Sequence, residues 1–145
     1  MNNELIGNEE NLLIYKNEEG NIIVDAIFKN ETLWLTQKGM SKVFGCSVDN
    51  ISLHLKNIFK DNELDENAVT EKTSITASDG KKYQTKIYNL DAIISVGYRI
   101  NSKKATEFRI WATKILKEKE PDLKADGELQ LDAAIIPEVA EFKAK

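Results

Sequence analysis

The sequence LTQKGMSKVFGCSVDNISLHLKNIF, residues 35–59, has the spacing of two amphipathic helices joined by a tight turn. Thr36 can cap a first helix that ends at Phe44, because its hydroxyl can accept a hydrogen bond from a backbone N–H of the first turn. Gly45 ends that helix, since glycine enters the left-handed conformation at little cost. Ser47 can cap the second helix. This arrangement predicts a helix-turn-helix, whose second helix can enter the DNA major groove.

Both predicted helices carry an apolar stripe at intervals of three and four residues. The stripe of the second helix consists of Val48, Ile51, Leu55, Ile58 and Phe59. On the rest of that helix, six side chains are candidates for contacts with DNA: Asn50, Ser52, Leu53, Lys56, Asn57 and Lys60. Asparagine can pair with adenine through two hydrogen bonds, and serine can reach either base type. An ordinary helical hairpin packed into a core has the same spacing and remains an alternative.

The composition is typical of one soluble globular domain. The chain has 145 residues, of which 41% are apolar and 30% are charged. No apolar run approaches the roughly 20 residues that span a bilayer, so we expect no membrane contact, and the first ten residues lack the features of a signal peptide. Cys46 is the only cysteine, which excludes an internal disulfide and fits the reducing cytoplasm where we expect the protein to act.

The net charge of −4 conceals an uneven distribution. Residues 32–60 and 73–119 are basic, whereas residues 1–31, 61–72 and 120–145 are acidic. Local charge determines the field that a phosphate backbone meets, so the basic segments indicate a double-stranded DNA partner despite the negative total. A lysine-rich surface that binds nothing is the simpler alternative.

Three short strands are predicted before the helix pair, at residues 12–16, 22–28 and 32–35, with Gly20 in the first turn. Trp34 is expected to pack this sheet against the helices. Residues 1–11 are acidic and rich in asparagine, and we expect a flexible terminus there.

A second hairpin is predicted from strands at residues 73–77 and 83–88, joined by Asp79 and Gly80 in a type I′ turn. A hairpin after a helix-turn-helix is similar to the wing of a winged helix. Its lysines, Lys81, Lys82 and Lys86, would then follow a phosphate backbone. A hairpin that only completes the sheet is the alternative.

Two further helices are predicted at residues 90–98, capped by Asn89, and 102–117, capped by Ser102. Lys103 and Lys104 oppose the dipole preference at the start of the second of these, as expected if a partner supplies negative charge. The sequence therefore predicts an α+β fold over residues 12–117: a winged helix-turn-helix-like domain with a small antiparallel sheet and C-terminal helices.

Residue types needed for catalysis or metal binding are scarce. One histidine and one cysteine cannot form a His/Cys metal site within one chain, and no glycine-rich phosphate loop is present. His54 lies about two helical turns beyond Cys46, too far for the pair to act as base and nucleophile. We therefore expect no cofactor, no metal and no enzymatic activity.

Three stretches together resemble the bacterial virulence-associated RhuM family. They are VDAIFKNETLWLTQKGMSKVFG, ISLHLKNIFKDNELDENAV and YNLDAIISVGYRINSKKATEFRIWATKIL, within residues 14–116. The segment ATEFRIWATKIL is also similar to the end of the Bro-N domain of phage antirepressors. The resemblance implies a DNA-binding transcription regulator of the mobile-element type, with a homodimer or a protein partner as further expectations. A protein-interaction module of the antirepressor or adaptor kind, without DNA contact, is the alternative.

One departure from the family concerns the face of the second helix. Many relatives place Arg or Lys near positions 48 and 53, where this chain has Val48 and Leu53, and Asp49 adds a negative charge. The departure puts base-specific recognition in more doubt than general affinity for DNA.

The tail, residues 118–145, is acidic and follows a helix that Pro121 would break. Its segments DGELQLDAA and PEVA are similar to a stretch of bacterial phosphate acetyltransferase. Because that resemblance covers only a fragment of the enzyme, we expect a fusion and carry over no acetyltransferase activity.

Overall fold

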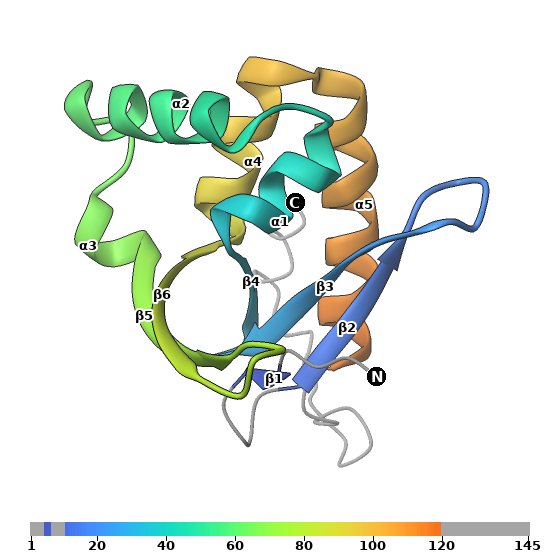
Figure 1. Cartoon of the computed structure of the whole chain (residues 1–145). Coiled ribbons are helices and arrows are strands. Elements are labelled where there is room, and N and C mark those ends of the chain that lie inside the picture. Colours follow the sequence, from blue (N-terminus) through green and yellow to red (C-terminus); the bar gives the residue numbers. More distant parts are fainter. Residues whose placement is uncertain (1–4, 7–10, 120–145) are drawn as a thin grey trace, which may run out of the picture.

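The computed structural model describes residues 5–6 and 11–119, which form one antiparallel sheet with helices on one side of it (Figure 1). The predicted α+β class, with a small antiparallel sheet and C-terminal helices, is confirmed. The elements follow each other as β1 (Leu5–Ile6), β2 (Asn11–Lys16), β3 (Ile22–Lys29), β4 (Thr32–Leu35), α1 (Gln37–Phe44), α2 (Val48–Lys60), α3 (Glu66–Val69), β5 (Thr70–Thr76), β6 (Lys82–Asn89), α4 (Leu90–Ile100) and α5 (Ser102–Glu118).

The sheet has the strand order β1-β5-β6-β4-β3-β2, and every neighbouring pair is antiparallel. β5 and β6 pair along their whole length, but β6 joins β4 only through Tyr88 and Asn89. The half of this hairpin near its loop, residues 73–85, is therefore not paired with β4. The sequence did not predict β1, because two apolar residues carry no periodicity; the rest of that terminal segment, residues 1–4 and 7–10, lies outside the described residues.

The main core lies between the sheet and the helices, where α1, α2, α4 and α5 each bury an apolar stripe. Its largest fully buried side chains include Phe44, Phe108, Leu33, Met40 and Ile93. α5 docks on β2 through three rings, since Tyr15 lies 4.9 Å from both Phe108 and Trp111, measured between ring centroids. Edge and tilted ring contacts of this kind add to the burial energy.

Gly97 on α4 permits the closest approach between helices. A Cβ at this position would lie 2.6 Å from the Phe44 ring and 2.9 Å from the Cβ of Ala105. Phe44 ends α1 and Ala105 lies in the first turn of α5, so three helices meet at this glycine. Any larger side chain here must push the helices apart.

The expectation for Trp34 was wrong. Its neighbours on β4, Leu33 and Leu35, face the helices, so Trp34 points to the opposite side of the sheet. There it forms a second small cluster with Ile27 and Ile87, and its indole N–H donates to the carbonyl of Lys29 at 2.8 Å. Both faces of the sheet are therefore covered by apolar side chains at β4.

The type I′ turn predicted in the second hairpin was also wrong. Gly80 has a left-handed backbone, but Asp79 does not, and a type I′ turn needs both. The Gly80 N–H instead donates to the carbonyl of Ala77 at 2.9 Å, as in a three-residue loop that ends with a left-handed glycine. The first hairpin has the same loop, with Gly20 bonded to Asn17 at 2.9 Å.

Two smaller corrections concern helix residues. The N-cap of α5 is Asn101, whose side chain accepts from the Lys104 N–H, and Ser102 is the first helical residue. Asparagine and serine are equally good caps, so sequence alone did not decide between neighbours. Val48 was expected in the core stripe of α2, but it is 42% exposed because it begins the helix beyond the edge of the core.

Replacing Gly97 by alanine is expected to destabilise the fold. The added methyl group overlaps the buried Phe44 ring, and the helix propensity gained offsets only part of that cost, leaving a net loss of about 1–2 kcal/mol. Thermal unfolding measures the difference. Ser95→Ala on the same helix is the matched control and should not lower the melting temperature, whereas equal stability of both variants would contradict the close approach.

Candidate nucleic-acid interface

The helix pair α1–α2 has the predicted caps and turn. The Thr36 hydroxyl accepts from the Gly39 N–H at 2.9 Å, and the Ser47 hydroxyl accepts from the Asn50 N–H at 3.0 Å. Gly45 lies between them with φ of 72°, and its N–H donates to the carbonyl of Ser41. These local bonds fix where α1 ends and where α2 begins, and so they set the direction of α2.

α2 buries Ile51, Leu55 and Ile58 and turns its other side to solvent. Of the predicted contact residues on this helix, Leu53, Lys56 and Lys60 are exposed, whereas Asn50, Ser52 and Asn57 are half-buried.

The helical period separates the half-buried candidates. At about 100° per residue, Asn50 and Ser52 lie about 160° apart around the axis, so they belong to opposite flanks of α2. Asn57 lies on the flank of Asn50. Asn50, Leu53, Asn57 and Lys60 therefore form one continuous surface, which excludes Ser52.

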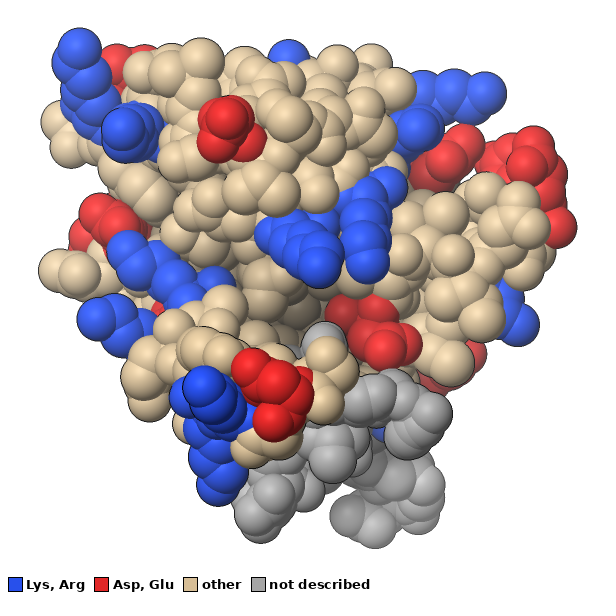
Figure 2. Space-filling view, viewed as in Figure 1, with Lys and Arg blue, Asp and Glu red and all other residues tan. Residues whose placement is uncertain are grey.

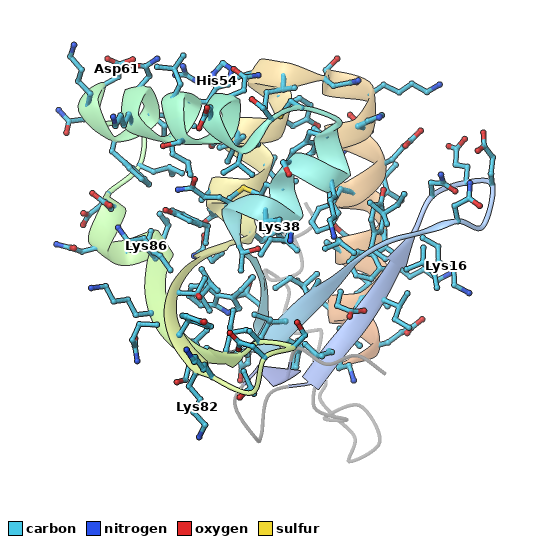
Figure 3. The ribbon with its side chains drawn as sticks, in the orientation of Figure 1. Lys16, Lys38, His54, Asp61, Lys82 and Lys86 are labelled. Atoms are coloured by element: carbon cyan, nitrogen blue, oxygen red, sulfur yellow. The ribbon has the colours of Figure 1, made fainter. Side chains whose placement is uncertain are left out.

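The predicted hairpin lysines are exposed but spread along the molecule. Figure 3 shows Lys82 and His54 at opposite ends of this face, with Lys38 and Lys86 between them. Lys81 and Lys82 therefore lie far from α2. A ligand that contacts both α2 and these two lysines must also cover the part of the face where Lys38 and Lys86 lie.

Sequence analysis missed the two lysines that occupy this middle region. Lys38 and Lys42 are exposed on α1, and Figure 2 shows basic side chains over α1 at the centre of the face. Both lysines are therefore accessible to an anion that approaches α1. Both lysines belong to the basic segment 32–60, which is the signal in the sequence that points to them. They were not among the predicted contact residues because those of the helix pair were taken from the second helix and not from the first.

Lys103 and Lys104 lie at the start of α5, next to the turn of the helix pair. The Lys104 amino group is 3.1 Å from the position that a Cβ on Gly45 would occupy. The structure therefore brings one α5 lysine beside the α1–α2 turn, although some 60 residues separate them in sequence. Both side chains are exposed, and in the described part of the chain neither has an ion-pair partner.

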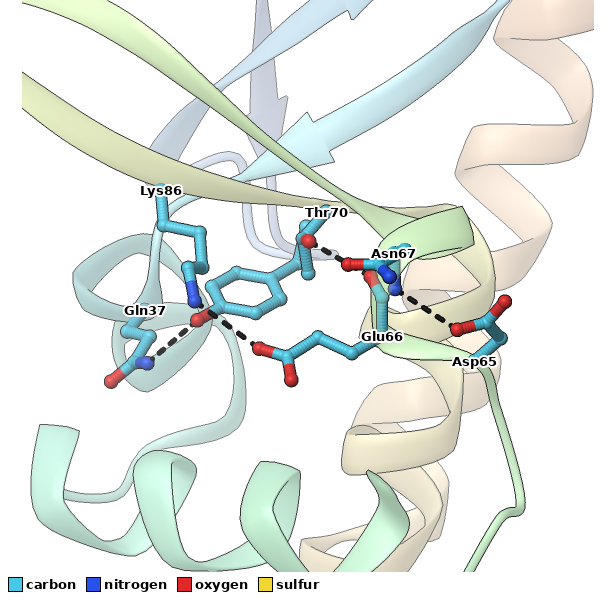
Figure 4. A network of polar contacts seen from close by, with 7 residues as sticks. Gln37, Asp65, Glu66, Asn67, Thr70 and Lys86 are labelled. Carbon is cyan, nitrogen blue, oxygen red and sulfur yellow. Dashed lines mark hydrogen bonds and ion pairs between the residues drawn. The ribbon is translucent and has the colours of Figure 1, made fainter. Parts of the chain in front are cut away.

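Lys86 differs from the other predicted lysines because it is paired. Its amino group lies 3.2 Å from a carboxylate oxygen of Glu66, the first residue of α3 (Figure 4). Both side chains are 40–48% exposed, so the pair contributes little to stability and can exchange for another anion.

The acidic loop after α2 is used for ion pairs and caps. Glu63 accepts from Arg99 of α4 at 2.9 Å, Asp61 lies 4.0 Å from the same guanidinium group, and Asp65 caps α3. Within residues 5–6 and 11–119, no group of three or more His, Cys, Asp or Glu side chains is placed to hold a metal ion.

Hydrogen bonds stiffen the tip of the second hairpin. The Asp79 carboxylate accepts from the Lys81 N–H at 2.9 Å and from the Tyr83 hydroxyl at 2.9 Å. The Lys81 bond, followed by the Tyr83 bond, lowers the pKa of Asp79 below its ordinary value, and the same Asp79 bond raises the pKa of Tyr83. The loop thus holds the backbone of Lys81, whereas Lys82 is the first residue of β6 and pairs with Thr76 in the sheet.

Residues 68–120 match the model of the Virulence protein RhuM family. The match is less than half of the chain, and it runs from α3 to the end of α5 without α1 and α2.

Two curated relatives are phosphate acetyltransferases. The enzyme of Acetivibrio thermocellus is 41% identical over 83 residues, which is 57% of this chain and 24% of that protein. The enzyme of Bacillus subtilis is 64% identical over 33 residues, which is 23% of this chain and 10% of that protein. This chain thus spans a quarter or less of their length. Both matches are longer than the tail, residues 118–145, of which the structure describes only residues 118 and 119.

No solved structure matches the chain. None of the helices in residues 11–119 has the length and apolar character needed to cross a membrane.

Substituting Tyr83 by phenylalanine should raise the pKa of Asp79 part of the way to its ordinary value, because the Lys81 N–H bond remains. A carboxyl with a depressed folded pKa stabilises the fold above its unfolded pKa and loses that effect as the pH falls through the folded value. Carbon-detected NMR titration of the Asp79 carboxyl measures the shift. Tyr98→Phe, a variant of another exposed tyrosine, should leave the Asp79 titration unchanged; an effect equal to that of Tyr83→Phe would contradict the assignment.

Proposed function

We propose that the protein binds double-stranded DNA through α1 and α2 and acts as a regulator of the virulence-associated or mobile-element type. The observation that carries the proposal is the capped helix pair, which leaves the outer side of α2 open to solvent next to the lysines of α1. α2 enters the major groove, while α1 crosses the phosphate backbone.

Phosphate contacts in this proposal come from lysines of three elements. Lys38 and Lys42 lie on α1, Lys56 and Lys60 on α2, and Lys104 beside the turn. Among the described residues, none of these five has a carboxylate within ion-pair distance, so no existing pair must break when a phosphate approaches. The hairpin lysines Lys81 and Lys82 act as a wing that reaches phosphates farther along the duplex.

Base contacts in this proposal come from one surface of α2. Asn50 and Asn57 can each form two hydrogen bonds with adenine, and Leu53 between them can contact a thymine methyl group. Ser52 lies on the other flank and contacts the backbone at most. Three residues give a modest selectivity, so affinity depends mainly on phosphate contacts.

The name of the RhuM family supports the virulence-associated role, and the match of that family covers the wing and α5 rather than the helix pair. We carry over no acetyltransferase activity to the proposed regulator, because the match covers only 24% of the length of that enzyme. It acts in the bacterial cytoplasm, and pairing of two copies on two half-sites suits a reader of this kind.

Binding to a mixed-sequence duplex is expected to weaken steeply as salt increases, since bound lysines release counterions. Lys56→Gln should weaken binding on every sequence and reduce the slope of log affinity against log salt by about 0.9. Fluorescence anisotropy between low and physiological salt measures both quantities. Lys16→Gln on β2, away from α2 in Figure 3, removes the same charge and should change neither.

Sequence preference is tested separately with Asn57→Ala. This variant should reduce the difference in affinity between duplexes of different sequence and leave the salt slope of binding unchanged. No binding of the unaltered chain to any duplex would overturn the proposal.

A second candidate function is a protein-interaction module that keeps this fold without contacting DNA. The observation that favours it is Leu53 on α2, an apolar side chain that is 54% exposed. An apolar side chain exposed on a helix suits the groove of a partner protein.

Leu53→Asp distinguishes the two functions. In an interaction module it should abolish binding to a partner that survives high salt, because a carboxylate cannot enter an apolar groove. Pull-down from cells of the source organism at high salt measures this. Ile110→Asp on α5, where the isoleucine is 58% exposed, is the matched control and should retain the partner. If both variants retain every salt-resistant partner, the α2 surface is not a protein interface.

A further inference from the structure

A cleft lies between the start of α1 and the strand β6, on the helix side of the sheet. Its volume is about 370 Å³, and it is open to solvent. The N-terminal end of α1 supplies one wall, and β6 supplies the other. The residues that line it are all polar: Thr36, Gln37, Lys38, Gln84, Thr85, Lys86 and Tyr88.

Tyr88 is the most informative of these residues. Its side chain belongs to the main core and is only 4% exposed, yet its hydroxyl lines the cleft. The hydroxyl oxygen accepts from the Gln37 amide at 2.9 Å (Figure 4). A phenol also donates one hydrogen, and no side chain or carbonyl in the described part of the chain accepts it. Because the hydroxyl lines a cleft that is open to solvent, this hydrogen is available to an acceptor that enters the cleft.

One lysine lines each wall of the cleft, Lys38 on α1 and Lys86 on β6. Lys38 lies in the first turn of α1, which contains no acidic residue, and among described residues its amino group has no ion-pair partner. The α1 dipole adds partial positive charge at the same end of the helix. Lys86 lies on the opposite wall, paired with Glu66 at 3.2 Å in an exposed contact that can exchange.

We infer that the α1–β6 cleft binds a phosphate group. The Tyr88 hydroxyl donates to one oxygen, the Gln37 amide can donate its second hydrogen to another, and Lys38 and Lys86 balance the charge. A tetrahedral anion suits several donors that converge from two walls, whereas a carboxylate offers only two oxygens. When the phosphate enters, Lys86 exchanges Glu66 for it.

Two sources can supply such a group. A phosphodiester of the DNA backbone fits if the proposed function holds, since α1 would then cross the backbone at this cleft. A phosphate of a small molecule fits otherwise, and the volume of the cleft leaves room for more than the phosphate itself. The inference about the cleft deepens the proposed function, but it is tested independently of it.

The test begins with the full chain and sodium phosphate, with sodium chloride at matched ionic strength as the reference. NMR spectra should show saturable shifts of the backbone amides of Gln37, Lys38 and Tyr88 with phosphate alone. Tyr88→Phe retains the buried ring and removes only the donor, so phosphate affinity should fall about tenfold. Lys16→Gln, far from the cleft, should leave the shifts unchanged. Absence of saturable shifts in the unaltered chain would overturn the inference.

Duplex binding then identifies the source of the phosphate. If the backbone supplies it, Tyr88→Phe should weaken duplex binding without changing the salt slope, while Lys38→Gln should weaken it and reduce the slope by about 0.9. If phosphate shifts the cleft residues but both variants bind the duplex normally, the site takes a small-molecule phosphate. If the unaltered chain binds no duplex and phosphate still shifts these residues, the proposed function fails and the phosphate site stands.

Discussion

The arrangement of the helices depends on one steric constraint, the absence of a side chain at Gly97. The ring of Phe44 occupies the space where a Cβ would be, and Ala105 closes the contact from α5. Phe44 is the last residue of α1, and Gly45 turns the chain into α2 directly after it. The packing at Gly97 therefore holds the end of α1 against α4 and α5, and the turn at Gly45 carries that position over to the start of α2.

Acidic residues form ion pairs with basic residues of β6 and α4, whereas the lysines of α1 and α2 are not paired in this way in the described part of the chain. Glu66 and Glu63, both in the segment after α2, pair with Lys86 and Arg99. The lysines of α1 and α2 keep no such partner within the described residues. In the part that the structure describes, a chain with a net charge of −4 thus keeps lysines without carboxylate partners on α1 and α2, and local charge is what an approaching anion meets.

Sequence analysis succeeded where structure is determined by near neighbours. The caps at Thr36, Ser47 and Asn89 and the left-handed Gly45 depend on bonds within a few residues, and all four are confirmed. It failed where contacts between distant segments determine the structure. Trp34 could be buried on either face of the sheet, and the pairing of β4 with β3 and β6 determines which face it takes. The cleft was missed for the same reason, because α1 and β6 are some 45 residues apart and neither alone forms a site.

Asn89 has two structural roles, since it ends β6 and its side chain caps α4 by accepting from the Ala92 N–H at 3.2 Å. No loop separates the hairpin from the helix, so nothing between them can absorb a rotation. The hairpin is held to the rest of the sheet at both ends, by the pairing of Tyr88 and Asn89 with β4 and by the pairing of Ile75 and Thr76 with β1. One residue thus sets the direction in which α4 leaves the sheet, and with it the path of α4 to the contact between Gly97 and Phe44.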